Sequence, residues 1–201
     1  MKEDSLEELL GKTRSIRKFR HETKIPAETL EELVELTRLC PSGGNRQPLK
    51  FLPVNTEEDC RFVSEHIRWA ALLKDWDGPE ESEKPSAYVL VLIDRTVCEK
   101  APYDSGIAAH AMLLGAVERG FAGCMLGNID RDALAEYFSI DKKRYVTDLV
   151  VALGEPGEES VVEETGTGTA YYRDEEGLFH VPKRKLSEIL LKAGSRDRAK
   201  A

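Results

Sequence analysis

Apolar residues recur along this chain with two spacings, one typical of helices and one typical of strands. Between Pro26 and Leu39 they recur at i, i+3, i+4 and i+7, which is one face of an amphipathic helix with a proline in its first turn. The positions of this stripe are Leu30, Leu33, Val34 and Thr37. Residues 87–93 form an unbroken apolar run of strand length, which predicts a strand buried on both faces.

Further elements follow from the same spacing and from the residues that cap helices. Helices are also expected over residues 5–11, 57–67, 102–119, 130–138 and 186–192, and strands over residues 49–54 and 145–153. Thr56 and Asp130 are the expected N-caps of two helices, and Gly120 is expected to end the longest one. The acidic, glycine-rich tract 155–177 is expected to be a surface excursion, and residues 194–201 a frayed tail.

The order of these elements alone favours a doubly wound parallel sheet, because helices alternate with buried strands. A dinucleotide-binding sheet of that class would carry a G-x-G-x-x-G turn after a strand, and the sequence has no such turn. No internal repeat or linker divides the chain, so residues 1–201 are expected to form a single domain.

The composition is that of a globular protein, since 41% of the 201 residues are apolar and 33% are charged. The net charge of −8 argues against a nucleic-acid-binding protein, although a local arginine cluster is still compatible with binding one phosphate. The longest apolar run is far too short to span a membrane, and residues 1–10 are polar and acidic. Neither a membrane partner nor a secretory signal is therefore expected.

Cysteine and histidine usage argues against a metal site. The cysteines, Cys40, Cys60, Cys98 and Cys124, show no C-x-x-C spacing, and the four histidines are dispersed. We therefore expect reduced thiols, no bound metal and a cytoplasmic protein.

A glycine-containing loop, Cys-Pro-Ser-Gly-Gly-Asn-Arg-Gln-Pro over residues 40–48, lies between a predicted helix and a predicted strand. Its consecutive glycines permit positive φ angles and a close approach of the backbone to a ligand. The amides of Asn45 and Gln47 offer donors and an acceptor to the edge of a planar heterocycle. An ordinary connector between helix and strand is the alternative.

A second segment, Thr-Arg-Ser-Ile-Arg-Lys-Phe over residues 13–19, suits a phosphate. Arg14 and Arg17 provide guanidinium forks, and Ser15 provides a hydroxyl donor. Taken alone, such a basic run is more often a solvated face, since Arg and Lys side chains are usually exposed.

These two segments together resemble the signatures of the FMN-dependent nitroreductase family, an Arg-Ser-x-Arg-x-Phe run and a flavin-binding loop. Residues 120–128 look like the family's strand and glycine turn beside the flavin ring, and residues 180–186 like the basic strand end that returns to the flavin phosphate. The resemblance extends from about Leu9 to Leu190. It implies an α+β nitroreductase-like fold, in which helices flank a mixed, mostly antiparallel central sheet.

The resemblance also implies a bound FMN. The residues expected to bind it are Arg14, Ser15, Arg17, Ser42, Gly43, Asn45, Gln47, Leu126, Gly127, Lys183 and Arg184. The two basic segments would hold the phosphate, the loop would hold the ribityl chain and the ring edge, and Leu126 and Gly127 would lie near the redox-active N5. No catalytic side chain is assigned, because the cofactor carries the redox chemistry.

An oxidoreductase that passes hydride from NADH or NADPH through FMN to a nitroaromatic, a quinone or a similar acceptor is the leading interpretation. Family members are typically homodimers with flavin at the subunit interface, and Arg46 is the residue nominated for a cross-subunit role. The sequence departs from the family at Thr13, where many relatives carry arginine, and at Leu49, where relatives often carry an aromatic residue.

Three alternatives stay open. One is a family member with another flavin reaction, such as dehalogenation or flavin fragmentation. The second is a flavin-binding protein for storage or sensing without significant turnover, and the third is a phosphate-binding protein unrelated to flavin. The segment with the two tryptophans, Trp69 and Trp76, is either core packing or, as in the family, a border of the substrate pocket.

Overall fold

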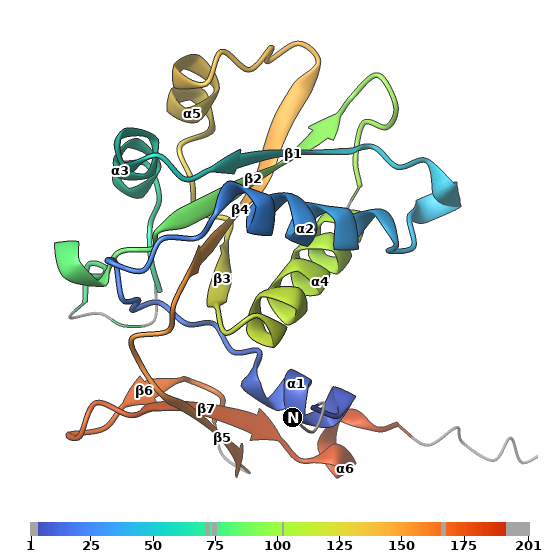
Figure 1. The fold of residues 1–201 in the computed structure, drawn as a ribbon. Coiled ribbons are helices and arrows are strands. Elements are labelled where there is room, and N and C mark those ends of the chain that lie inside the picture. Colours follow the sequence, from blue (N-terminus) through green and yellow to red (C-terminus); the bar gives the residue numbers. More distant parts are fainter. Residues whose placement is uncertain (1–3, 71–72, 74–75, 102, 166–167, 192–201) are drawn as a thin grey trace, which may run out of the picture. The chain divides into compact units, whose positions relative to one another are not determined.

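The computed structural model describes residues 4–70, 73, 76–101, 103–165 and 168–191 (Figure 1). The chain divides into two compact units, residues 1–159 and 160–201, and each is described by itself. The helices of the first unit are α1 (Leu6–Lys12), α2 (Ala27–Arg38), α3 (Glu57–Glu65), α4 (Asp104–Glu118) and α5 (Arg131–Tyr137), with the short 3-10 helices η1 (Gly43–Asn45) and η2 (Glu81–Glu83). Its strands are β1 (Leu49–Val54), β2 (Ala87–Asp94), β3 (Ala122–Leu126) and β4 (Tyr145–Gly154). The single-domain organisation expected from the sequence stays a prediction.

The four strands of the first unit form an antiparallel sheet in the order β1-β2-β4-β3. The mostly antiparallel α+β fold is therefore confirmed, and the parallel sheet favoured by element order alone is wrong. Every residue of β2 is buried, as its unbroken apolar run predicts. An unbroken apolar run indicates that both faces of a strand are covered. It does not indicate whether the neighbouring strands are parallel or antiparallel.

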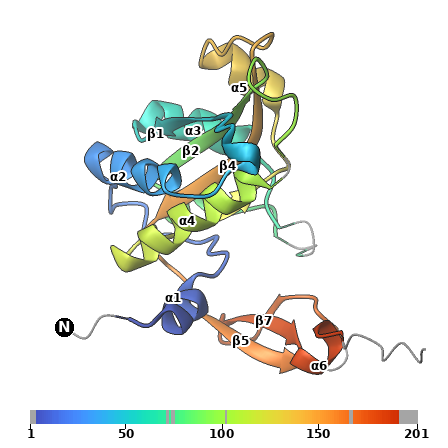
Figure 2. The ribbon, with the colours of Figure 1, turned by 90° about the vertical axis from the view of Figure 1, so that its right-hand side faces the viewer.

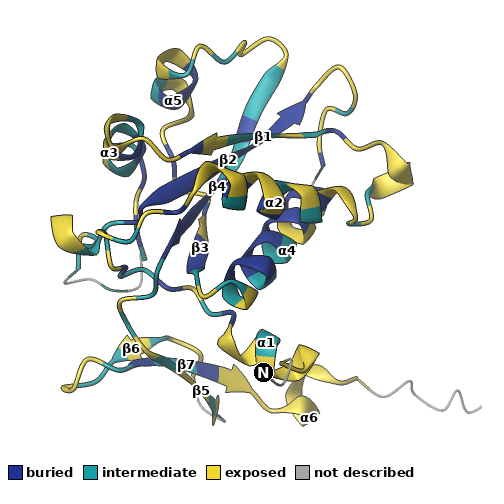
Figure 3. Ribbon diagram, in the orientation of Figure 1, coloured by how far each residue is buried: buried dark blue, intermediate teal, exposed yellow. Residues whose placement is uncertain are grey.

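Two apolar clusters fill the spaces on either side of this sheet. Tyr88 and Leu90 of β2 belong to the cluster under α3 and α5, while Val89 and Val91 belong to the cluster under α2 and α4. This alternation follows from the two-residue period of a strand. Figure 3 shows β2 and most of β4 as buried, and Figure 2 shows α2 and α4 side by side on one face.

Helices α2 and α4 approach each other closely at Gly115. A Cβ at this position would lie 2.2 Å from Cδ1 of Leu36 and 3.1 Å from Cδ2 of Leu33, both on α2. The predicted buried stripe of α2 is confirmed at Leu30, Leu33 and Thr37, which are buried, while Val34 is partly buried. Within the described ranges, no helix is both long enough and apolar enough to cross a membrane.

The predicted helix ends are close to the observed ones. Thr56 and Asp130 cap α3 and α5 as predicted, through bonds from the amides of Asp59 and Ala133. Helix α3 ends at Glu65, two residues before the predicted end, and Gly120 follows α4 with φ of +80°.

The second unit contains strands β5 (Ser160–Thr165), β6 (Tyr172–Arg173) and β7 (Phe179–Arg184), followed by the short helix α6 (Leu186–Ile189). Their order is β5-β7-β6, with β5 parallel and β6 antiparallel to β7. Residues 155–177, predicted to be a surface excursion, include β5 and β6, whose residues are all exposed or half-buried; that the tract forms strands was not predicted. The predicted tail, residues 194–201, lies outside the described residues.

The tryptophan segment contributes to the core. Trp69 is buried, and its ring lies edge-to-face with Trp76 at a centroid distance of 6.4 Å. Gly78 leaves room for this packing, since a Cβ there would lie 2.8 Å from Cδ1 of Trp69. These contacts support the core-packing interpretation for Trp69, while residues 71–72 and 74–75 lie outside the described residues.

Candidate functional site

The N-terminal arginine segment, Arg14–Arg17, lies along the free edge of strand β3. Ser15 forms a parallel bridge with Gly123, and the amide of Ile16 donates to the Gly123 carbonyl at 3.1 Å. Gly123 has no space for a side chain, because a Cβ would lie 2.0 Å from the carbonyl oxygen of Ala152. The sheet therefore fixes the backbone of this segment, while the side chain of Ser15 stays exposed.

Arg14 has an incompletely bonded guanidinium group. Its Nη2 donates to the carbonyl of Leu10 at 2.7 Å, whereas its Nε is buried and has no hydrogen-bond partner among the described residues. Partial burial lowers the pKa of Arg14, because removing water disfavours the charged form. An anion bound here would supply both the missing acceptor and the missing charge, so the residue fits a phosphate.

The side chains of Arg17 and Lys18, next to Arg14 in the sequence, have bonding partners within the chain. Nη1 of Arg17 donates to the carbonyl of Ser15 at 3.1 Å, and the amides of Arg17 and Lys18 donate to Oε1 of Glu158 at 2.6 and 3.2 Å. The ammonium group of Lys18 lies 2.8 Å from Glu83, so this lysine is a poor substitute for the arginine that Thr13 replaces.

The end of β3 lies on the same edge as the arginine segment. Leu126 is buried, whereas Gly127 is exposed and its carbonyl accepts a 3.4 Å bond from Nη2 of Arg131. Gly123 and Gly127 are four residues apart, which corresponds to about 14 Å at about 3.4 Å per residue. One edge of the sheet therefore carries both the arginine segment and the glycine turn.

The glycine loop, Ser42–Gln47, has an unusual backbone. Gly44, Asn45 and Gln47 have φ angles of +59°, +53° and +51°, so two residues with side chains occupy the left-handed region. Nε2 of Gln47 donates to the carbonyl and to Oδ1 of Asn45, at 3.2 and 3.1 Å. The two amides are exposed and lie together, as a site that reads a heterocycle edge requires.

Asp104, the first residue of α4, is a contact of this loop that sequence reasoning missed. Its Oδ2 accepts a 2.5 Å bond from the Ser42 hydroxyl, and its Oδ1 accepts a 3.2 Å bond from the Gly43 amide. Ser42 in turn accepts a 2.9 Å bond from the Gln47 amide. An aspartate in the first turn of a helix is common for electrostatic reasons, so its position carries no specific signal of this contact.

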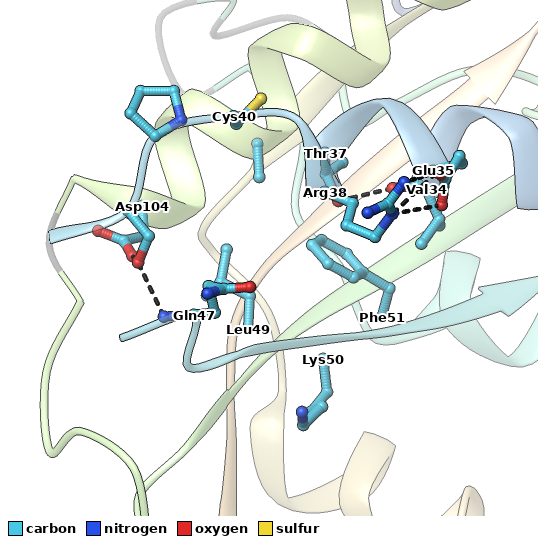
Figure 4. A pocket seen from close by; sticks show the side chains of 13 residues that line it. Val34, Glu35, Thr37, Arg38, Cys40, Gln47, Leu49, Lys50, Phe51 and Asp104 are labelled. Atoms are coloured by element: carbon cyan, nitrogen blue, oxygen red, sulfur yellow. Dashed lines mark hydrogen bonds and ion pairs between the residues drawn. The ribbon is translucent and has the colours of Figure 1, made fainter. Parts of the chain in front are cut away.

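A pocket of about 300 Å³ opens between the glycine loop, α2 and β1 (Figure 4). Its apolar lining includes Val34, Leu49, Phe51 and Ala108, and its polar lining includes Ser42, Gln47 and Asp104. Figure 4 shows the ion pair of Arg38 with Glu35 at one side of this pocket and Asp104 at the other.

The arginine segment and the glycine loop lie at opposite edges and opposite ends of the sheet. The loop leads into Leu49 of β1, which pairs with Ile93 of β2, and Ile93 pairs with Val146 of β4. Gly123 of β3, next to the arginine segment, pairs with Leu153 of β4. Val146 and Leu153 are seven residues apart, about 24 Å, and three strand spacings add about 14 Å across the sheet. The two parts are thus separated by roughly 28 Å on a flat sheet, measured from Gly123 to Leu49.

The remaining predicted residues belong to the second unit and to the glycine loop. Lys183 and Arg184 end strand β7 of the second unit, and both are exposed. Nη1 of Arg184 lies 3.4 Å from Oε2 of Glu188. Arg46 is exposed in the glycine loop, with Nη1 at 3.7 Å from Sγ of Cys98.

The chain is similar to known proteins in sequence and in fold. The sequence profile of the Nitroreductase family matches residues 10–155. YdgI of Bacillus subtilis, described as an NAD(P)H nitroreductase, is 24% identical over 192 residues, covering 79% of this chain and 92% of YdgI. A protein of Archaeoglobus fulgidus, described as an NADH dehydrogenase or NAD(P)H nitroreductase, is 30% identical over 155 residues, covering 73% of this chain and 82% of that protein.

A solved structure from Desulfovibrio desulfuricans, described as a nitroreductase in complex with FMN, has the same fold. It superposes with a TM-score of 0.69 and 22% identity, covering 96% of this chain and 99% of that one. The nitroreductase-like fold expected from the sequence is confirmed.

Proposed function

Because the chain belongs to the nitroreductase family, we propose that it is an FMN-dependent oxidoreductase that passes hydride from NADH or NADPH to a small acceptor. The acceptor class that we propose is nitroaromatic compounds, quinones and similar planar molecules. The family membership supports redox chemistry on a flavin, and the residues of this chain support the binding of that flavin.

The main support for FMN binding is the incompletely bonded guanidinium group of Arg14. Its buried Nε lacks an acceptor among the described residues, beside the exposed hydroxyl of Ser15 and on the sheet edge that also carries Gly127. A ribityl phosphate with its adjoining ring can extend along this edge, with the phosphate at Arg14 and Ser15 and the ring near Gly127. Arg17 would add positive charge at the phosphate, whose charge is roughly −1.5 to −2.

The protein's task is to bind and orient the cofactor. FMN supplies the hydride chemistry when bound, so no side-chain nucleophile is required. Leu126, at the end of β3, has a buried side chain. The exposed backbone of Gly127 is available to stabilise charge at the flavin ring. In the glycine loop, Ser42 and Gly43 set the backbone and the amides of Asn45 and Gln47 would contact the flavin.

We propose a homodimer in which each flavin site combines parts of two chains. The separation of roughly 28 Å between the arginine segment and the glycine loop supports a site that combines the segment of one chain with the loop of another. Exposed apolar side chains at the start of α4 support association, since Tyr103, its N-cap residue, is 77% and Ile107 38% exposed. A twofold-symmetric dimer would make two equivalent sites.

Mixed dimers test this arrangement. Arg14→Ala and Asn45→Ala chains are each expected to lose FMN, and refolding them together gives one intact site in every mixed dimer. About a quarter of wild-type FMN content should then return if the two residues act from different chains of a symmetric dimer. No recovery would mean that both residues act within one chain, and retention of FMN by the Arg14→Ala protein would remove Arg14 from the site.

The visible absorption spectrum of the purified protein tests the function itself. A flavin band that bleaches anaerobically with NADH or NADPH is the expected result, and a reoxidation screen with nitroaromatics and quinones would then identify the acceptor. A band that persists with both donors would favour storage or sensing instead. A colourless protein that does not bind added FMN would overturn the proposal.

A cytoplasmic location is part of the same proposal. All four cysteines are free thiols, which supports a reducing compartment. Cell fractionation with an antibody to the protein is the direct test.

A further inference from the structure

The glycine loop holds a conformation that its own sequence does not favour. Asn45 and Gln47 both have φ near +50°, a region that residues with side chains rarely occupy. Gln47 in particular lacks the short side chain that makes this region accessible to asparagine. Such a backbone persists only when surrounding contacts determine it, so the structure must contain a group that holds the loop.

Asp104 is that group. Its side chain is buried, at 8% exposure for the residue, and each carboxylate oxygen accepts one bond from the start of the loop. Through the Ser42 hydroxyl the contact continues to the Gln47 amide at the end of the loop. One carboxylate therefore controls both ends of a six-residue segment, Ser42–Gln47.

The carboxylate is itself held on a rigid base. Asp104 is the first residue of the fifteen-residue helix α4, and Ala108, Ala109 and Met112 of that helix are buried in the core. A negative charge in the first turn is also stabilised by the helix dipole. The position of the loop is therefore set by the helix and not by the loop's own connections.

We propose that Asp104 is the positioning residue of the flavin-binding loop, which fixes the direction of the Asn45 and Gln47 amides without contacting the cofactor. This inference rests on the proposed FMN binding. The chemistry explains why a carboxylate is required, since both of its partners, a hydroxyl and a backbone amide, donate. An Asn side chain has one acceptor oxygen, so its NH₂ group would face a second donor.

The test measures flavin affinity and potential in the Asp104→Asn full-length protein. FMN is removed, FMN and riboflavin are added back to the apoprotein, and dissociation constants are read from flavin fluorescence. We expect both constants to rise about tenfold or more, the effect of losing a bond to a charged group. The midpoint potential of the bound FMN should shift as well, because ring contacts change. Arg14→Ala should instead weaken FMN binding and spare riboflavin, which has no phosphate.

Asp59→Asn is the matched control. Asp59 also accepts bonds from two hydroxyls, of Thr56 and Tyr137, but it lies on α3 away from the loop. It should lower the thermal stability of the apoprotein and leave both flavin constants and the potential unchanged.

Three results would overturn the inference. The first is wild-type affinity and potential in Asp104→Asn, and the second is equal weakening in Asp104→Asn and Asp59→Asn. If Asp104→Asn does not fold, Ser42→Ala is measured by the same criteria, and an unchanged affinity and potential in that variant is the third. A wild-type apoprotein that binds no FMN would instead refute the proposed function, which keeps the two failures distinct.

Discussion

Gly123 gives the sharpest test of how packing supports the candidate site. The substitution Gly123→Ala adds one methyl group at the second residue of β3. The new carbon would lie 2.0 Å from the Ala152 carbonyl oxygen and 3.0 Å from Cδ2 of Leu113. The nearer atom belongs to the backbone of β4, so rotating a side chain gives no relief. Strand β3 must move away from β4.

The cost follows from what that movement disrupts. Overpacking a core costs about 1–3 kcal/mol, and each backbone bond lost between β3 and its neighbours adds about 0.5–1.5 kcal/mol. The bond from the Ile16 amide to the Gly123 carbonyl is one of those at risk. We therefore expect Gly123→Ala to lower the free energy of unfolding by about 3–5 kcal/mol, a large part of a typical 5–15 kcal/mol.

Gly115→Ala is the matched control, because it also adds one methyl group to a buried glycine. There the new carbon meets the methyl ends of Leu36 and Leu33, and the higher helix propensity of alanine returns about 0.8–1 kcal/mol. The net cost should be about 0–2 kcal/mol, since overpacking costs about 1–3 kcal/mol.

Urea unfolding of the apoproteins measures both changes, and FMN titration measures the effect on the site. Gly123→Ala should also weaken FMN binding, since Ser15 is bridged to residue 123, whereas Gly115→Ala should not. Equal destabilisation by the two substitutions, or a Gly123→Ala protein as stable as wild type, would refute the reasoning.

Two further predictions concern the core and the second unit. Leu33→Ala, at a fully buried position of α2, should lower the free energy of unfolding by about 2–5 kcal/mol, whereas Leu39→Ala, at a 72% exposed position, should change it by no more than about 0.5 kcal/mol; urea unfolding of the pair checks this, and similar losses would contradict it. Bonds from both ring nitrogens of His180, to Asp174 at 3.0 Å and to Glu163 at 3.1 Å, raise its pKa. The stabilisation that His180 gives is therefore complete below the ordinary histidine pKa and is lost as pH rises through the raised pKa. The difference in hydrogen-exchange protection of β7 between wild type and His180→Asn should therefore shrink with rising pH. A difference that grows with pH would contradict this role of His180.

Local features of this fold were readable from the sequence because each depends on a few neighbouring residues. The stripe of α2, the burial of β2 and the cap of α5 at Asp130 all follow from spacing and from a side chain bonding its own helix. The strands β5 and β6 were not readable, because β5 is compatible with a loop and β6 has only two residues, and both become strands by pairing with β7.

The arrangement of the candidate site residues was not predictable from local sequence patterns. Asp104 is separated from Ser42 by sixty-two positions, and no local pattern links the two. The incompletely bonded guanidinium of Arg14 depends on the path of the chain around it, so it too is a property of the folded state. The placement of the arginine segment and the glycine loop at opposite edges follows from strand order, which hydrophobic spacing does not encode.

The sheet order β1-β2-β4-β3 has a thermodynamic consequence for a flavin held between two chains. Cofactor binding and subunit association then become one linked equilibrium, in which each ligand stabilises the assembly by about 2.7 kcal/mol at a hundred times its dissociation constant. Two sites give about 5.4 kcal/mol, which strengthens subunit association about ten-thousand-fold. Dilution alone would release flavin from such a protein, and the supply of flavin in the cell would set how much of the chain is assembled.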